Sequence, residues 1–459
     1  MKELTVASAT PDRRRAAVFA VTVVGAFMAS LDLSVVNVAF PALERSWPHD
    51  SQAALAWVIT AYAIVYGSLL VTAGRTADRL GRRRIFFYGL WTFTVASGLC
   101  SLAPSLAWLI AGRIGQGVGA ALLLPASLGL LLEAFPHSLR SQAVALWAGA
   151  GALAVATGPS LGAALITAGG WRLAFVINVP IGVVGWAFGR RILADDRPSG
   201  ARAPSDYAGV ALVTVALAAL VLGISEGPTW GWADGRVLGC LAGSIVLGAL
   251  FVRRCRRRAE PLLDLSLFAD RSFAVANAAT ALYAMGFFAM LLGNILFLTS
   301  VWRYSILDAG LAITPGPIVV AIVSRWSGTL AARHGFRAVL LPGFAVFAAG
   351  LVWYVVRVGP QPDYLGSWLP GTLVCGLGIG MTFPVLAAAA VSSLGAARFA
   401  VGSAVNQTAR QVGGAIGVAV LVAILAGAAA DPIAHFDTMW AFAAVMAVAA
   451  GLSVVLLQP

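Results

Sequence analysis

The stretch Gly74-Arg75-Thr76-Ala77-Asp78-Arg79-Leu80-Gly81-Arg82 connects two apolar runs and occurs twice in the chain. Its second copy is Gly328-Thr329-Leu330-Ala331-Ala332-Arg333-His334-Gly335-Phe336. Glycine, alanine, arginine and glycine recur at four positions with a constant offset of 254 residues, whereas Ala332 stands opposite Asp78. We therefore expect the apolar segments that flank the two copies to correspond, so that the chain consists of two related halves.

Apolar runs of membrane-spanning length fill most of the chain. Hydrophobic residues make up 60% and charged residues 11% of the 459 residues, whereas soluble domains contain about 25% charged residues. This composition excludes a soluble protein, and its high hydrophobicity excludes a disordered one. Because a helix crosses the hydrocarbon core with about 20 apolar residues, the runs predict fourteen transmembrane helices. They cover residues 16–40, 53–74, 85–103, 107–132, 142–167, 171–193, 207–225, 236–252, 273–299, 307–330, 337–356, 367–392, 401–428 and 437–457.

Basic residues are concentrated in alternate loops. With a cytoplasmic N-terminus, the cytoplasmic segments contain 23 of the 31 Lys and Arg residues, and the outer loops contain five. This asymmetry follows the positive-inside rule and predicts a multi-pass protein of the cell membrane with both termini cytoplasmic. The net charge of +12 is then a topology signal, which argues against nucleic-acid binding. The arginines within 253–258 are expected to contact anionic lipid headgroups, or simply to be solvated.

The repeat divides the chain into three parts. Residues 1–193 are expected to form an N-terminal six-helix half and residues 273–459 a C-terminal six-helix half. Residues 194–272 are expected to be a linker that contributes two inserted helices, 207–225 and 236–252. The predicted fold class is an all-α membrane protein with two pseudo-symmetric halves, an arrangement found in transporters.

Asp32 is the sharpest functional candidate because it lies inside the first expected helix. A charged side chain at membrane depth costs about 2.5–3.5 kcal/mol, so it must face a cavity or a partner. Removal from water favours a neutral carboxyl group, and we expect Asp32 to bind and release a proton. Arg113 in the fourth helix stays charged and is its expected partner. The alternatives are a fixed ion pair that only joins helices and an arginine that reaches the membrane surface.

The fifth expected helix contains Gly158, Pro159 and Gly162. Proline removes a backbone hydrogen bond and kinks a helix, and two glycines four residues apart allow a neighbouring helix to come close. The pattern predicts either simple packing or a hinge against the opposite half.

The loop that opens the repeat suggests a conformational latch. Asp78 and Arg79 lie at expected helix ends, where helix dipoles attract opposite charges. A salt-bridged latch between the halves, built from Asp78, Arg79, Gly74 and Gly81, would favour one state by about 1–3 kcal/mol. The run 82–84 is interpreted separately, as a topology and lipid-contact signal.

Together these segments resemble the fourteen-spanner drug:proton antiporters of the major facilitator superfamily, and the similarity covers nearly the whole chain. The matching segments are Leu31–Pro41, Gly74–Arg84, Arg113–Ala121, Gly158–Gly162, Trp171–Gly182 and Asn406–Gly414. The resemblance implies the major facilitator fold, proton coupling at the motif that begins with Arg113, and antiport at the motif of the fifth helix. Thr76, Phe40 and Ala163 depart from the family's pattern, and Ala163 weakens the hinge interpretation most.

The expected function is export of a hydrophobic or cationic compound from the cytoplasm in exchange for protons, with Asp32 as the proton carrier. Such a transporter is not an enzyme and needs no catalytic residue, metal or cofactor, because the proton gradient drives it. Candidate contacts with the small-molecule substrate, or alternatively helix-packing groups, are Gln116, Asn178, Asn294, Asn406 and Gln411. Arg410 has no adjacent acid, which suits an anionic group on some substrates.

Other functions remain open from the sequence. The chain could be a dedicated exporter of an endogenous metabolite, antibiotic or siderophore. A proton symporter for uptake and a non-transporting membrane sensor are further alternatives. In a cell with two membranes, a periplasmic adaptor is a candidate partner.

Overall fold

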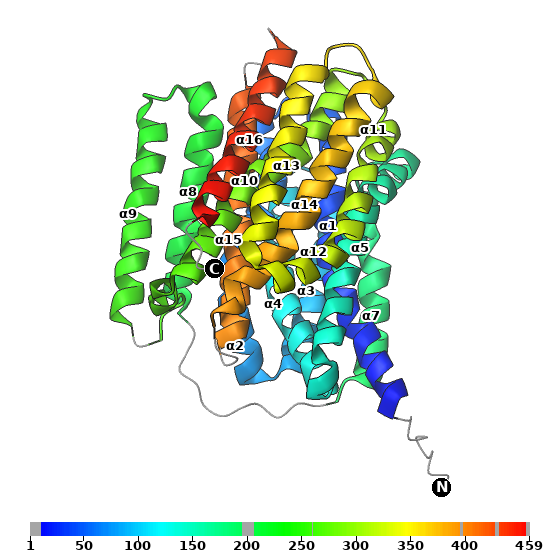
Figure 1. Cartoon of the computed structure of the whole chain (residues 1–459), viewed down its shortest axis with the longest axis vertical. Coiled ribbons are helices and arrows are strands. Elements are labelled where there is room, and N and C mark those ends of the chain that lie inside the picture. Colours follow the sequence, from blue (N-terminus) through cyan, green and yellow to red (C-terminus); the bar gives the residue numbers. More distant parts are fainter. Residues whose placement is uncertain (1–10, 195–205, 259, 395–397, 427–430, 456–459) are drawn as a thin grey trace.

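The computed structural model describes residues 11–194, 206–258, 260–394, 398–426 and 431–455, which form helices and no strand. The elements are α1 Pro11–Ser46, α2 Gln52–Leu80, α3 Arg82–Ser101, α4 Leu106–Ala134, α5 His137–Gly169, α6 Leu173–Val176, α7 Asn178–Ile192, α8 Tyr207–Trp230, α9 Gly235–Arg257, η1 Leu265–Ala269, α10 Arg271–Ser300, α11 Ile306–Ile313, α12 Pro315–His334, α13 Phe336–Arg357, η2 Tyr364–Trp368, α14 Leu369–Ser392, α15 Phe399–Leu425 and α16 Pro432–Val454. Figure 1 shows them as one bundle of long helices that run roughly along the same axis. Residues 195–205 at the start of the expected linker 194–272 lie outside the described residues.

Among the described residues, thirteen helical segments are long and apolar enough to cross a membrane. This confirms an all-helical membrane protein, with one fewer clear span than the fourteen expected. The remaining expected span corresponds to α3, which has 20 residues and begins with three arginines at 82–84. Because those arginines occupy its first turn, α3 has a shorter apolar stretch than its neighbours, although it packs along α4 within the bundle.

Two expected helices are each divided into two segments. The expected helix 171–193 is α6 followed by α7, and the expected helix 307–330 is α11 followed by α12. Pro180 lies in the first turn of α7, and Pro315 begins α12. Since proline has no amide hydrogen, it cannot continue the hydrogen bonding of a preceding helix.

The internal repeat is visible in the backbone. Gly81 follows the end of α2 and Gly335 follows the end of α12, with φ values of 101° and 86° that favour glycine. Each glycine amide donates to the carbonyl of the alanine four residues earlier, Ala77 or Ala331. The repeated alanine and glycine therefore form the same helix cap in both copies.

Helix packing repeats in the same way. Gly119 of α4 lies against the backbone of Phe93 in α3, and Gly378 of α14 lies against the backbone of Phe347 in α13. Neither position has room for a Cβ atom. The two phenylalanines are again 254 residues apart, so equivalent helices in the two halves use the same close approach.

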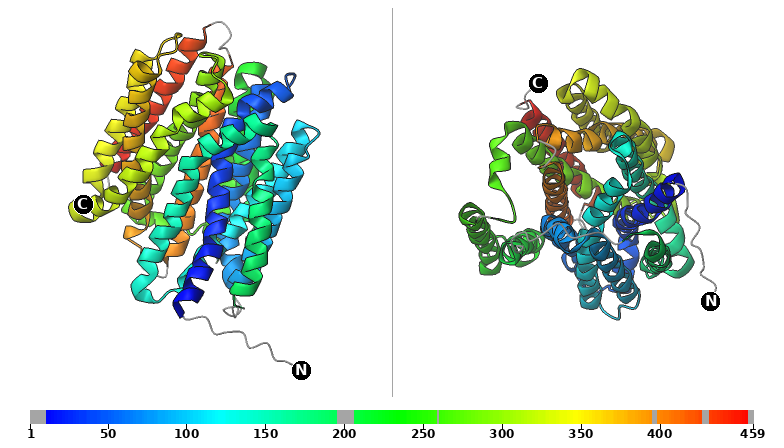
Figure 2. Two further views of the ribbon diagram at one scale, coloured as in Figure 1. Left: turned by 90° about the vertical axis from the view of Figure 1, so that its right-hand side faces the viewer. Right: turned by 90° about the horizontal axis from the view of Figure 1, so that it is seen from below.

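The inserted helices α8 and α9 lie at the side of the bundle (Figure 1), and the view from below in Figure 2 shows the same arrangement. A small apolar cluster joins α8 to α2 and α15. It contains Ala63, Ile64, Val221, Ala415 and Ala419. Helix α9 packs along α8 and is mostly exposed. The insert therefore covers one of the contacts between the two halves from outside.

The main contacts between the halves are those of α2 with α15 and of α5 with α11 and α12, and α1 also packs against α10. On the first contact, Thr408 donates to the Gly67 carbonyl at 2.9 Å. On the second, Gly310 of α11 lies so close to Pro159 and Ala163 of α5 that a Cβ would collide with both. The functional groups described next lie in helices that border these contacts.

The motif of the fifth helix serves two contacts at once. Gly158 and Gly162 face α1, where Ser34 and Val35 leave little or no space for a Cβ. Pro159, on the adjacent side, faces α11 of the opposite half. The close packing is therefore observed, and a hinge at this position stays a prediction.

Candidate functional site

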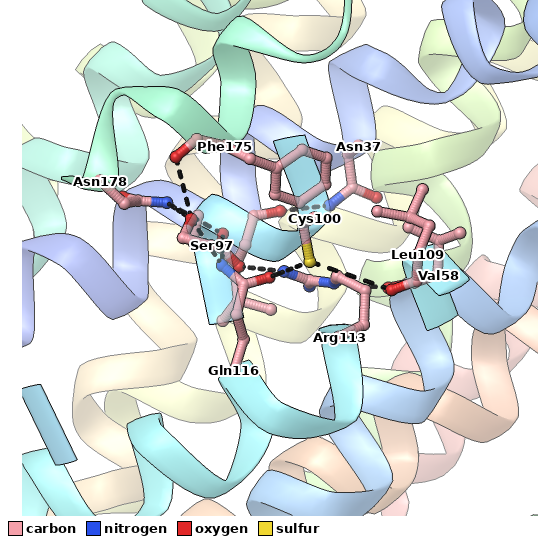
Figure 3. A network of polar contacts seen from close by, with 11 residues as sticks. Asn37, Val58, Ser97, Cys100, Leu109, Arg113, Gln116, Phe175 and Asn178 are labelled. Atoms are coloured by element: carbon pink, nitrogen blue, oxygen red, sulfur yellow. Dashed lines mark hydrogen bonds and ion pairs between the residues drawn. The ribbon is translucent and has the colours of Figure 1, made fainter. Parts of the chain in front are cut away.

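Asp32 of α1 and Arg113 of α4 form a salt bridge inside the N-terminal half, within the polar network drawn in Figure 3. Arg113 NH1 lies 2.5 Å from Asp32 Oδ2, and both side chains are 0% exposed. The structure thus brings together the two residues that the sequence singled out. Removing both charges from water is costly unless they are paired and hydrogen-bonded, and the surrounding groups supply those bonds.

Two amides and one hydroxyl complete the surroundings of the carboxylate (Figure 3). Gln116 Nε2 donates to Asp32 Oδ1 at 3.0 Å, and Asn178 Nδ2 donates to the same oxygen at 3.3 Å. Both amide nitrogens also donate to Ser97 Oγ, at 3.0 Å and 3.1 Å. The Ser97 hydroxyl donates to the Phe175 carbonyl at 2.9 Å. Its hydrogen is therefore used, and its lone pairs keep both amide NH₂ groups turned toward the carboxylate.

Arg113 is held on several sides. Its Nε donates to the Val58 carbonyl at 2.7 Å, and its NH1 also donates to Gln116 Oε1 at 2.8 Å. The guanidinium carbon lies 4.3 Å from the centre of the Tyr62 ring and 5.9 Å from that of Phe175. Cation–π contacts of this kind stabilise a desolvated arginine. The guanidinium therefore keeps favourable contacts when the carboxylate loses its charge.

The chemistry of the site follows from its donors. The described contacts to Asp32 come from Arg113, Gln116 and Asn178, all through N–H groups. Such donors stabilise the ionised carboxylate. A protonated Asp32 needs an acceptor, and Asn178 Oδ1 is buried without a hydrogen-bond partner. Presenting this acceptor to Asp32 requires the Asn178 amide to turn and to give up its bond to Ser97.

Gln116 and Asn178 thus donate to the Asp32 carboxylate. Two other candidate substrate contacts, Asn294 and Asn406, form hydrogen bonds between packed helices. Asn294 Oδ1 accepts from Trp440 Nε1 at 2.9 Å. Asn406 Nδ2 donates to Thr280 Oγ1 at 2.9 Å and reaches Asn277 at 3.3 Å. For these four residues the structure favours hydrogen bonds within a half over contact with a substrate.

Gln411 and Arg410 have different surroundings, at the contact between α15 and α2. Gln411 is 1% exposed, and its side chain lies against Gly67. Arg410 is partly buried with its guanidinium carbon 4.7 Å from the centre of the Phe383 ring. Both residues therefore border the boundary between the halves.

The latch candidates lie where α2, α3 and α4 meet. Arg82 donates to Asp78 Oδ1 at 2.8 Å and to Glu133 Oε1 at 3.1 Å. Gly74 faces Pro125 of α4, and Arg79 is exposed. The pairs seen here join helices of the N-terminal half, and a latch to the opposite half stays a prediction.

The groups that orient Asp32 and Arg113 were not predicted from the sequence. Ser97 and Cys100 of α3 both contact Gln116, Cys100 through its Sγ at 3.5 Å. Tyr62 of α2 covers Arg113. A small hydroxyl in an apolar helix gives no sequence signal because it can bond within its own helix. The tyrosines at 62 and 66, one helical turn apart, were the available clue.

The described residues contain no group of three or more His, Cys, Asp or Glu side chains that could hold a metal ion. The four cysteines are free thiols, and three of them are buried. The site is therefore built from one ion pair, amides, a hydroxyl and aromatic rings.

Comparison with known proteins places the chain in a family. The model of the Major Facilitator Superfamily matches residues 22–418. A solved structure of a bacterial homologue of human drug peptide transporters has a TM-score of 0.63 and covers 96% of this chain and 97% of that one. It is 16% identical, so this likeness concerns the fold alone.

Three curated relatives are more similar in sequence. The Multidrug resistance protein Stp of Mycobacterium tuberculosis is 34% identical over 385 residues, which are 84% of this chain and 71% of the relative. The Methylenomycin A resistance protein of Streptomyces coelicolor is 32% identical over 81% of this chain and 77% of its own length. The Tetracenomycin C resistance and export protein of Streptomyces glaucescens is 33% identical over 72% of this chain and 61% of its own length. The chain belongs to the major facilitator superfamily, among its drug efflux transporters.

Proposed function

We propose that this protein is a proton-coupled antiporter that exports a hydrophobic compound from the cytoplasm across the cell membrane by alternating access. The observation that carries the proposal is the fully buried pair of Asp32 and Arg113. An ionisable residue in the interior of a membrane protein is expensive and commonly belongs to a proton or substrate pathway. The relatives' names, which describe resistance and export, support an exporter over an uptake symporter.

In the proposed cycle, Asp32 is ionised when the transporter binds its substrate from the cytoplasm. The donors from Arg113, Gln116 and Asn178 hold that state. The two halves then rock about the contacts α2–α15 and α5–α11 and open the site outward. There Asp32 takes up a proton, and its weakened attraction for Arg113 favours the return movement. Release of the proton into the cytoplasm completes the exchange.

The test is a substitution that keeps shape and polarity and removes the proton. Asp32→Asn should abolish uphill export in proteoliposomes with an imposed pH gradient, because an amide cannot titrate, and downhill movement of substrate should persist. Asp32→Glu should retain part of the activity. Asp234→Asn is the matched control, since Asp234 caps α9 at the surface and pairs with the exposed Arg236. Uphill export at the normal rate by the Asp32→Asn protein contradicts the proposal.

A dedicated exporter of an antibiotic is a second candidate. The relatives named for resistance to methylenomycin A and for export of tetracenomycin C favour it. Profiling the compounds that accumulate in cells after deletion of the gene separates it from a broad drug exporter. A single accumulating compound supports the dedicated exporter.

A further inference from the structure

Arg410 is a charged residue near the middle of α15, which runs from Phe399 to Leu425. Its Nε atom is buried and has no hydrogen-bond partner. Within the part of the chain that the structure describes, no carboxylate forms a salt bridge with Arg410, and Asp32 is already bound by Arg113. The charge of Arg410 is therefore left without an anionic partner.

An unpaired arginine at this depth calls for an explanation. Arginine remains charged in proteins, and charged residues inside membrane proteins pair with one another or face a substrate pathway. Contact with the Phe383 ring offsets part of the cost. It leaves unused the in-plane N–H groups of the guanidinium, which are the groups that bind carboxylates in a bidentate manner.

The Phe383 ring that Arg410 contacts belongs to a cluster of aromatic rings in the C-terminal half. The Phe383 ring packs edge-on against Tyr283 and Phe287, with ring centres 4.9 Å and 5.0 Å apart. One turn before Arg410 on α15, Gln407 donates to the Tyr66 hydroxyl of α2 at 3.3 Å. Aromatic rings, a phenol and a cation thus meet at a contact between the halves.

A neighbouring amide adds unused hydrogen-bonding capacity. Gln411 follows Arg410 on α15 and is 1% exposed. Neither its Nε2 nor its Oε1 has a hydrogen-bond partner. Buried polar groups of this kind normally find a partner, so this amide is a further unused donor and acceptor on α15, next in sequence to Arg410.

We propose that Arg410 recognises an anionic group of the exported compound, and that this compound is an aromatic molecule with a carboxylate beside its ring system. The carboxylate would accept from the guanidinium, and the rings would extend the aromatic surface of Phe383. Such a ligand contacts α2 of one half and α15 of the other. The proposal deepens and rests on the proposed export function, and it replaces the cationic compounds that the sequence allowed, because a cation is repelled by Arg410.

Binding of a matched pair of fluorescent probes tests the proposal. The pair is 9-anthroate and its methyl ester, which share a ring system and differ in charge, measured on the purified full-length protein in nanodiscs. The wild-type protein should bind the carboxylate more tightly than the ester. Arg410→Gln should weaken binding of the carboxylate by roughly tenfold to a hundredfold, the usual range for a charge-assisted hydrogen bond, and should change binding of the ester by less than about threefold.

Two further variants guard against misfolding and non-specific charge effects. Arg410→Lys keeps the charge without the planar fork and should retain part of the preference. Arg325→Gln removes an exposed arginine of α12 in the same half and should behave like the wild type. Equal affinity of the wild-type protein for both probes, or an intact preference in Arg410→Gln, overturns the proposal.

The outcome can be separated from a failure of proton coupling. The Asp32→Asn protein should keep its preference for the carboxylate while losing uphill export. If Asp32→Asn exports normally and Arg410→Gln still loses the carboxylate preference, the antiport proposal fails and the assignment of Arg410 stands.

Discussion

The Ser97 hydroxyl orients the two amides that contact Asp32 in the N-terminal half. Ser97 accepts from the amides of Gln116 and Asn178 and donates to the Phe175 carbonyl. Without it, the Asn178 amide could rotate and present its oxygen to Asp32, whereas Gln116 stays fixed because its Oε1 accepts from Arg113. In the proposed proton coupling, Ser97 would therefore act as a positioning residue that touches the two amides and not Asp32 itself.

Substitution of Ser97 should slow proton-driven export. Ser97→Ala removes the acceptor that holds the Asn178 amide, so Asp32 loses a fixed donor, and uphill export in proteoliposomes should slow about tenfold, the usual size of a lost hydrogen bond. Downhill movement of substrate, which needs no proton transfer at Asp32, should be unchanged. Ser97→Thr keeps the hydroxyl and is the control. Equal slowing of uphill and downhill movement would indicate a packing role instead.

At the scale of single residues, the sequence predicted the two buried charges but not the polar groups that orient them. Asp32 and Arg113 stand out because any charge at membrane depth has a large cost. Asn294 and Asn406 are as polar as Asn178, yet they form packing bonds, because a neutral amide is satisfied by any suitable neighbour. Which amide faces the carboxylate depends on helix rotation, which hydropathy does not specify.

At the scale of elements, the buried carboxylate of Asp206 joins the start of α8 to the end of α9, and these two inserted helices form a hairpin. Asp206 caps α8 by accepting from the Gly209 amide at 3.1 Å, and it accepts from Arg254 of α9 at 2.7 Å. Its residue is 1% exposed. Burial opposes ionisation, but the hydrogen bonds from Arg254 and Gly209 outweigh it and hold the pKa of Asp206 below its ordinary value.

Removing this charge should loosen the ends of α8 and α9. Asp206→Asn keeps a good cap residue and loses the ion pair, which should cost about 1 kcal/mol because Arg254 is partly exposed to solvent. Trypsin cleavage within 253–258 should then accelerate about fivefold. The lowered pKa means that the stabilisation is complete above about pH 4 and is lost as the pH falls further.

The difference in Tm between wild type and Asp206→Asn should therefore disappear in acid. Asp234→Asn at the other end of the hairpin is the control, because that carboxylate is paired at the exposed surface. A difference in Tm that persists well below pH 4 would point to a role of Asp206 other than its charge.

Only some boundaries of the helices could be predicted from the sequence. The positive-φ glycines after α2 and α12 were recoverable from the repeated sequence. The breaks before α7 and α12 were not recognised, although Pro180 and Pro315 mark them. A continuous apolar run predicts an unbroken helix even when it contains one proline. Transmembrane helices tolerate proline because neighbouring helices can satisfy the carbonyl groups that the proline leaves free.

At the scale of the whole molecule, the two halves are equivalent in packing and unequal in charge. The N-terminal copy of the repeat carries Asp78 and its bonds to Arg82, whereas the second copy has Ala332. Asp78→Asn removes a charge from the network that joins α2, α3 and α4. We expect it to change the ratio of inward-open to outward-open protein by about 5- to 150-fold, the range of typical allosteric coupling.

Disulfide trapping measures that ratio. Introduced cysteine pairs at the ends of α5 and α12 nearest the arginine-rich loops report closure, in a protein whose four free cysteines are replaced. As controls, Thr214→Val and Ser244→Ala lie in α8 and α9 at the side of the bundle, and should leave transport intact. An unchanged ratio in Asp78→Asn, together with altered selectivity in the α8 or α9 variants, would contradict both the latch and the peripheral role of the insert.

If Arg410 binds the proposed anion, export has an electrical consequence for the cell. With Asp32 carrying one proton inward and Arg410 escorting a monoanion outward, each cycle moves two elementary charges through the membrane potential. Each charge is worth about 2.3 kcal/mol at 100 mV, so voltage alone would supply about 4.6 kcal/mol per cycle. A neutral compound would draw on half of that. Such an exporter would keep working in a medium whose pH equals that of the cytoplasm, because the voltage remains when the pH gradient has vanished.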